Sequence, residues 1–167
     1  RAAGLAEAGL QRVNVSLDSI DPERYAAVTQ RARLASVLAG LAAAKDAGLG
    51  PIKVNAVPQP DSFSTDAPQL LRFCLTHGYH LRFIEHMPLG DQVSWQRSRI
   101  VTRQQLLDAL VADGAVLTEL GEPRGSAPAE RWQVQWDELS GDVGIIASVT
   151  NPFCASCDRT GLTADGQ

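Results

Sequence analysis

The stretch Ile52-Lys-Val-Asn-Ala-Val57 alternates apolar with polar side chains, and this alternation indicates how the chain folds. In a strand, Ile52, Val54 and Ala56 would face one way, and Lys53 with Asn55 the other. The stretch follows a helical pattern that ends near residue 48 and precedes another that ends near residue 78. A strand between two helices predicts a sheet whose apolar face is covered by helices.

The neighbouring segments extend this pattern in both directions. Residues 12–17 and 79–84 are predicted strands, and residues 2–8 form a predicted helix. Asp21-Pro22-Glu23 starts a helix with a capping carboxylate and proline at the first helical position, and helical spacing continues toward residue 48. Further helices are predicted from Thr65, with Pro68 at its opening, and from the capping box Thr102-x-x-Gln105. Three consecutive strand and helix units predict a parallel sheet.

Residues 121–130 are rich in Gly, Pro, Ser and Ala, which predicts a linker. After it, Trp132, Val134 and Trp136 alternate on one face, and a turn is expected at Ser140-Gly141-Asp142 before a second strand at residues 143–149. The chain is therefore expected to divide into residues 1–120, with the strand and helix units, and residues 121–167, with a β-hairpin and a cysteine-bearing segment.

The polar faces of the strands are the first sign of a site. Strands of a parallel sheet are normally apolar on both faces, because helices cover both. Here Asn14, Ser16 and Asp18 share one face of the first strand, as Lys53 and Asn55 do in the second. A barrel with a ligand in its lumen would explain this pattern.

Lys53 and Arg82 are the candidate cations of that lumen. A buried lysine without a partner costs several kcal/mol or loses its proton, so Lys53 is expected to face an anion or a carboxylate. The alternative is a structural network in which both cations pair with acids such as Asp18 or Glu85.

Cys154 and Cys157 form a Cys-x-x-Cys pair, which is typical of half a metal site or of a redox dithiol. Cys74 lies on an apolar helical face and is expected in the core. The three histidines, His77, His80 and His86, are expected at helix ends and in loops, not as ligands.

Composition excludes several classes of protein. At 167 residues with a net charge of −4, the chain fits a globular domain without a broad basic face for nucleic acid. No apolar run approaches the roughly 20 residues of a spanning helix, so no membrane contact is expected. Three cysteines favour a reducing compartment, and we expect a cytoplasmic protein. Because the sequence starts at Arg1 within a predicted helix, we expect it to be a piece of a longer protein.

Four segments in order and spacing resemble the GTP 3′,8-cyclase family, the radical S-adenosylmethionine enzymes also called molybdenum cofactor biosynthesis protein A. They are Arg12-Val-Asn-Val-Ser-Leu-Asp-Ser19, Ile52-Lys-Val-Asn-Ala-Val57, Leu81-Arg-Phe-Ile-Glu-His-Met-Pro88, and Phe153-Cys-Ala-Ser-Cys-Asp-Arg159 with Leu162-Thr-Ala-Asp-Gly166. The resemblance runs the whole length of the chain. Four motifs in register are far more specific than the cysteine pair alone.

The resemblance implies an α/β fold, a partial TIM-type barrel with a C-terminal hairpin and cluster-binding loop. It also implies two 4Fe-4S clusters in the complete protein. One cluster, held by an N-terminal Cys-x3-Cys-x2-Cys that this sequence lacks, cleaves S-adenosylmethionine to the radical that starts cyclisation of GTP. The other has one iron without a protein ligand, and that iron binds the guanine. A homodimer that passes its product to a pterin-forming enzyme is also implied.

The family's binding residues correspond to particular positions of this sequence. Cys154 and Cys157 match two of three ligands of the second cluster, and the third would lie beyond Gln167. Lys53 and Arg82 match contacts to the GTP phosphates, and Ser16 and Met87 match contacts to S-adenosylmethionine. A further substrate-contacting run corresponds to Arg159, Thr160 and Gly161, where Gly161 stands in place of the family's second arginine.

Three other interpretations compete with this enzyme function. A truncated or degenerate relative could bind a cluster or a nucleotide without turnover, which Gly161 favours. A radical enzyme could act on another substrate, such as a peptide, although three cations suit a triphosphate better. A zinc or dithiol module would explain the cysteine pair alone.

Overall fold

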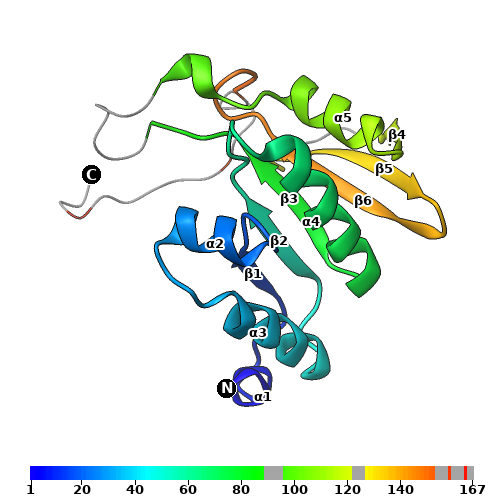
Figure 1. Cartoon of the computed structure of the whole chain (residues 1–167). Coiled ribbons are helices and arrows are strands. Elements are labelled where there is room, and N and C mark those ends of the chain that lie inside the picture. Colours follow the sequence, from blue (N-terminus) through cyan, green and yellow to red (C-terminus); the bar gives the residue numbers. More distant parts are fainter. Residues whose placement is uncertain (89–95, 122–126, 153–157, 159–163, 165–167) are drawn as a thin grey trace.

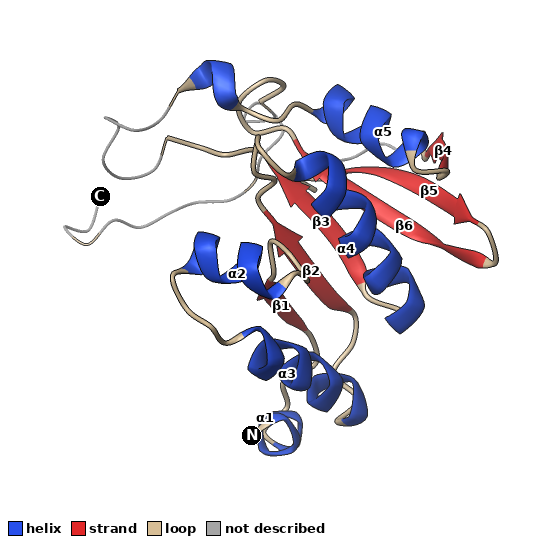
Figure 2. Ribbon diagram, in the orientation of Figure 1, coloured by secondary structure: helices blue, strands red, loops and turns tan. Residues whose placement is uncertain are grey.

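The computed structural model describes residues 1–88, 96–121, 127–152, 158 and 164. In this part of the chain, six strands form one sheet in the order β1-β2-β3-β6-β5-β4 (Figure 2). These strands are β1 (Val13–Ser16), β2 (Ile52–Ala56), β3 (His80–Ile84), β4 (Val116–Glu119), β5 (Glu130–Trp136) and β6 (Leu139–Ile146). β1, β2, β3 and β6 are parallel, whereas β5 is antiparallel to both β6 and β4. Among the described strands the sheet is open, so a mixed α/β fold is confirmed, whereas the expected partial TIM-type barrel is not.

Within the described ranges, five α-helices and one short 3₁₀ helix accompany the sheet (Figure 1). They are α1 (Ala2–Glu7), α2 (Pro22–Thr29), α3 (Leu34–Asp46), α4 (Phe63–His77), η1 (Arg97–Arg99) and α5 (Arg103–Ala112). α3 contacts β2, and α4 contacts β3 and β6, so these helices cover one face of the parallel strands.

The core lies between that face and the helices. Along β2 every second residue is buried, namely Ile52, Val54 and Ala56, as the alternation predicts. Leu70 and Leu71 of α4 are fully buried in the same cluster. Lys53 and Asn55 therefore lie on the opposite face of the sheet.

Two predicted helices differ from the structure, one because it is divided and one at its start. The long pattern between residues 21 and 48 is two helices, because Gln30 ends α2 in the left-handed conformation at φ 54°. α4 starts at Phe63, so Pro68 lies inside the helix instead of at its opening. The Asp21 cap and the Thr102–Gln105 capping box are both confirmed.

The predicted hairpin is confirmed, but its turn is misplaced. β5 and β6 pair up to Trp136 and Leu139, and Asp137 adopts φ 52° in the two-residue connection. Ser140, Gly141 and Asp142, the predicted turn, lie inside β6. Gly141 lies close to α4, where a Cβ would come within 2.6 Å of Leu75 Cδ2.

One strand was not predicted from the sequence. β4 pairs with β5 from Val116 opposite Gln135 to Glu119 opposite Trp132. β4 and β5 thus lie on either side of the expected division at residue 120 and pair in one sheet. The division itself stays a prediction.

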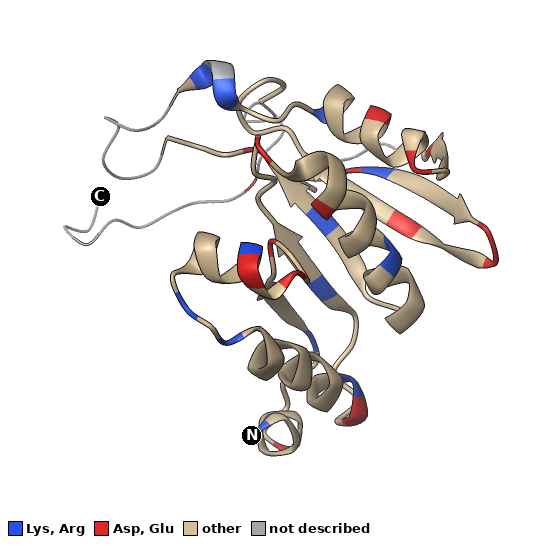
Figure 3. Cartoon of the chain, in the orientation of Figure 1, with Lys and Arg blue, Asp and Glu red and all other residues tan. Residues whose placement is uncertain are grey.

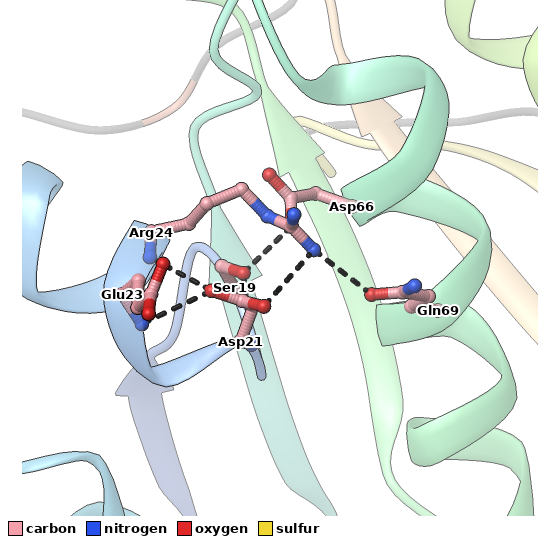
Figure 4. A network of polar contacts seen from close by, with 6 residues as sticks. All are labelled: Ser19, Asp21, Glu23, Arg24, Asp66 and Gln69. Carbon is pink, nitrogen blue, oxygen red and sulfur yellow. Dashed lines mark hydrogen bonds and ion pairs between the residues drawn. The ribbon is translucent and has the colours of Figure 1, made fainter.

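A polar network joins α2 and α4 near the carboxyl end of β1 (Figure 4). The Ser19 hydroxyl donates to Asp66 Oδ1 at 2.6 Å, and Arg24 Nε donates to the same oxygen at 2.7 Å. Ser19 and Asp66 are both buried. Asp21, the N-cap residue of α2, belongs to the same network, and its Oδ2 lies 3.6 Å from a terminal nitrogen of Arg24.

Candidate functional site

The polar face of the sheet carries two rows of side chains that cross neighbouring strands. In one row Asn14 of β1 is paired with Lys53 of β2, which is paired with His80 of β3. In the other row Ser16 is paired with Asn55, Asn55 with Arg82, and Arg82 with Gly144 of β6. Register partners of a parallel sheet share a face, so the residues that sequence alternation selected lie together.

Arg82 lies across this face and is held by two amide oxygens. Its Nε donates to Asn55 Oδ1 at 2.9 Å, and a terminal nitrogen donates to Asn14 Oδ1 at 3.0 Å. A Cβ at Gly144 would come within 3.2 Å of Arg82 Cγ. The missing side chain at residue 144 thus leaves room for the stem of the arginine, and the two amide oxygens orient its guanidinium group.

Lys53 is half-buried between Asn14 and His80 in the register. Its ammonium group makes no hydrogen bond or ion pair with any residue that the structure describes. Such a group on a partly buried surface favours an anionic ligand, because desolvation without a partner is costly.

Asp142 on β6 joins the neighbouring strands on either side. Its Oδ1 lies 2.7 Å from His80 Nδ1, and its Oδ2 accepts from Arg131 Nε of β5 at 3.0 Å. His80 thus lies in a strand and not in the expected helix end or loop. Figure 3 shows that basic residues occur on β2, β3 and β5 of the sheet.

These side chains line a groove of about 390 Å³ on the polar face. Its charged and polar lining residues are Lys53, His80, Arg82, Arg131 and Asp142. The groove brings three permanent cations together with one carboxylate and one histidine. This combination suits a polyanion such as a phosphate chain.

Asp18 and Glu85, the acids of the alternative structural network, form hydrogen bonds with groups other than Lys53 and Arg82. Asp18 Oδ1 accepts from the Val57 backbone N–H at 2.8 Å. Burial raises the pKa of Asp18, and the hydrogen bond from Val57 opposes that shift in part. Glu85 accepts from the backbone N–H groups of Val149 and Thr150 at 2.9 and 2.8 Å. Among the described contacts neither acid pairs with Lys53 or Arg82.

Ser16 and Met87 lie at the carboxyl ends of β1 and β3. Ser16 is the last residue of β1 and is exposed, and Met87 is half-buried three residues beyond Ile84. Ligands of open α/β sheets bind at this edge of the strands. The contact of Ser16 and Met87 with S-adenosylmethionine stays a prediction.

The remaining predicted site residues lie outside the described part of the chain. They are Cys154, Cys157, Arg159, Thr160 and Gly161. Cys74 is described, fully buried and unpaired, as expected for a core residue. Burial raises the pKa of its thiol to about 12, which disfavours the thiolate that metals require. Within the described ranges no group of three His, Cys, Asp or Glu side chains could hold a metal ion.

Sequence reasoning missed three lining residues of the groove, namely His80, Arg131 and Asp142, and it missed the contact of Asn14 with Arg82. His80 could have been found, because it precedes Arg82 by two positions and must share its face in a strand. Asp142 could not, because the turn was expected at that position.

Comparisons with known proteins agree with the resemblance. Residues 79–167 match the family Molybdenum Cofactor Synthesis C. The whole chain is 56% identical to a GTP 3′,8-cyclase of Mycolicibacterium smegmatis and covers 46% of it. It is also 56% identical to GTP 3′,8-cyclase 2 of Mycobacterium tuberculosis, covering 47%, and 53% identical to a GTP 3′,8-cyclase of Mycobacterium ulcerans, covering 47%. The chain spans about half the length of the curated relatives it matches. In the described parts, no helix has the length and apolar character needed to cross a bilayer.

Proposed function

The chain belongs to the molybdenum cofactor synthesis family of the GTP 3′,8-cyclases, and on this premise we propose that the protein cyclises GTP. The product would be (8S)-3′,8-cyclo-7,8-dihydroguanosine 5′-triphosphate, the first intermediate of molybdenum cofactor synthesis. The observation that carries the proposal is Lys53, a half-buried lysine without a described partner, in a groove that also contains Arg82.

In this function the groove holds the phosphates of GTP. Lys53 would contribute a compact ammonium group that can turn toward any phosphate oxygen. Arg82 would contribute a planar guanidinium group that can bind two phosphate oxygens at once. Because Asn55 and Asn14 already orient the guanidinium, little side-chain entropy is lost when the phosphate binds. Arg159, Thr160 and Gly161 would complete the contacts with the substrate.

Cofactor binding is assigned to the residues that match the family. Cys154 and Cys157 would hold a 4Fe-4S cluster, for which thiolates are the usual ligands, whereas the inert Cys74 does not fit that role. Ser16 and Met87 would contact S-adenosylmethionine. When bound, this cofactor and its own cluster supply the radical that starts the reaction. The homodimer, the pterin-forming partner and the cytoplasmic location belong to the same proposal.

A test of this function uses the full-length protein, reconstituted with iron and sulfide in the absence of oxygen. We expect two 4Fe-4S clusters, consumption of GTP and formation of the cyclised product with S-adenosylmethionine. Cleavage of S-adenosylmethionine without consumption of GTP would overturn the proposal.

The matched variants are Lys53→Gln and Lys45→Gln. Lys45 is exposed and donates to the His77 carbonyl oxygen, away from the groove. A lost contact to a charged group typically weakens binding about tenfold or more. We therefore expect weaker GTP binding for Lys53→Gln and unchanged binding for Lys45→Gln. Equal affinities of the two variants would contradict the assignment of Lys53.

A further inference from the structure

Lys53 and His80 are register partners on adjacent strands, and both line the groove. His80 Nδ1 lies 2.7 Å from Asp142 Oδ1. The other ring nitrogen, Nε2, makes no hydrogen bond with any described residue. One nitrogen of the ring is thus fixed, while the second is available beside the lysine.

The carboxylate of Asp142 decides which nitrogen carries a proton. An ionised carboxylate only accepts hydrogen bonds, so Nδ1 must be the donor of the contact. In the neutral ring Nε2 then has a lone pair and no proton. A phosphate oxygen is also an acceptor, so it can bind Nε2 only when the ring is protonated on both nitrogens.

The charges around His80 make this protonation dependent on the ligand. The charged groups that face it are Lys53 on β2, Arg82 on its own strand, Asp142 on β6 and Arg131 on β5. A phosphate chain bound in the groove adds negative charge beside the ring, and a nearby negative charge favours the imidazolium.

We infer that His80 is a proton-dependent contact for the phosphate chain and that GTP binding is coupled to the uptake of a proton by its ring. Asp142 is the positioning residue, because its contact with Nδ1 holds the ring with Nε2 available. This inference rests on the proposed function, in which the groove binds the GTP phosphates. It adds a ligand residue that sequence reasoning had expected in a loop or at a helix end.

The experiment is titration calorimetry of the full-length protein with GTP in two buffers of different ionisation enthalpy. The difference in heat between the buffers counts the protons taken up. GTP phosphates also exchange protons, so the count is compared between the wild type and His80→Gln with the same ligand. His77→Gln is the matched control, because His77 lies at the exposed end of α4 and contacts the Phe73 carbonyl oxygen.

We expect the wild type and His77→Gln to take up more protons than His80→Gln, with a difference of up to one. Between pH 6 and 8, the GTP affinity of the wild type should fall more steeply with rising pH than that of His80→Gln. The difference should be up to about tenfold per pH unit. Asp142→Asn should also reduce the uptake, and it tests the inference if His80→Gln does not fold.

The outcomes separate this inference from the proposed function. If the wild type does not bind GTP, the proposed function fails and the inference with it. If GTP binds and Lys53→Gln weakens it, but His80→Gln takes up as many protons as the wild type, only the inference fails.

Discussion

Glu85 and Thr150 are joined by two hydrogen bonds, one from the Thr150 backbone N–H at 2.8 Å and one from its hydroxyl group. The Val149 N–H donates to the same carboxylate at 2.9 Å, and Glu85 is only 1% exposed. Glu85 follows β3 directly, and Thr150 lies in the turn after β6. The contact therefore fixes the chain shortly before it reaches the cysteine pair.

Glu85→Ala should lower the free energy of unfolding by roughly 2–3 kcal/mol, because it leaves buried backbone donors without their acceptor. Chemical denaturation of the full-length protein measures this change. Glu138→Ala, in the exposed turn between β5 and β6, is the control and should change stability by less than about 0.5 kcal/mol. Equal effects of the two substitutions would show that the buried carboxylate is not an anchor.

The Ser19–Asp66–Arg24 network gives a second stability prediction. Asp66→Ala should cost about 2 kcal/mol, since it removes a buried acceptor shared by two donors. Asp61→Ala is a matched control, because Asp61 also pairs with an arginine, Arg99, but at an exposed position. Its expected cost is below about 1 kcal/mol. The prediction is wrong if thermal unfolding ranks the two variants in the opposite order.

Asp18 predicts a dependence of stability on pH. Burial raises the pKa of its carboxyl in the folded state above the ordinary value of 3.8. As pH rises from 3.8 through the folded-state pKa, the unfolded chain loses this proton first, so stability falls. Asp18→Asn keeps an oxygen that can accept from Val57 and removes the charge. It should stabilise the protein at pH 7 and have little effect below pH 3.8.

The measurement for Asp18 is the midpoint of urea unfolding across this pH range. Asp113→Asn serves as the reference, because Asp113 is exposed at the end of α5 and pairs only at the surface with Arg72. If Asp18→Asn raised the midpoint of urea unfolding at low pH as well, packing and not ionisation would explain the stabilisation.

Cys74 should resist alkylation in the folded protein. Its thiol is fully buried, and burial raises its pKa to about 12, so almost no thiolate exists at pH 8. Treatment with iodoacetamide followed by mass spectrometry should label residue 74 only after denaturation. Rapid labelling of Cys74 in the folded protein would contradict its place in the core.

The sequence predicted the parallel strands and the face that carries Lys53 and Arg82, because alternation along a strand directly fixes which residues share a face. It could not predict where the sheet ends. β4 is short and mostly exposed, so the sequence has no buried alternation there. An open sheet and a barrel also share the same local pattern, since closure depends on strands far apart in the chain.

The groove was predicted only in part, because two of its residues depend on the register of the hairpin. Glycine is common in turns, so the sequence predicts a turn at Gly141. In the structure, the absence of a side chain at this position leaves room for Leu75 of α4. That misassignment placed Asp142 in a turn and hid its contact with His80. The Arg82 ligands could be listed from the polar face, but their geometry comes from the pairing of three strands.

Gly161 is expected to limit the affinity of the full-length protein for GTP. The family resemblance places an arginine at this position, and glycine supplies neither charge nor a fork of donors. If residue 161 faces the substrate, Gly161→Arg in the full-length protein should tighten GTP binding about tenfold, which matches one additional contact to a charged group. Gly161→Gln adds similar bulk without charge and should bind no more tightly than the wild type. If both variants bound GTP more tightly, packing and not charge would explain the higher affinity. If both bound GTP more weakly, the site of this chain would be adapted to glycine.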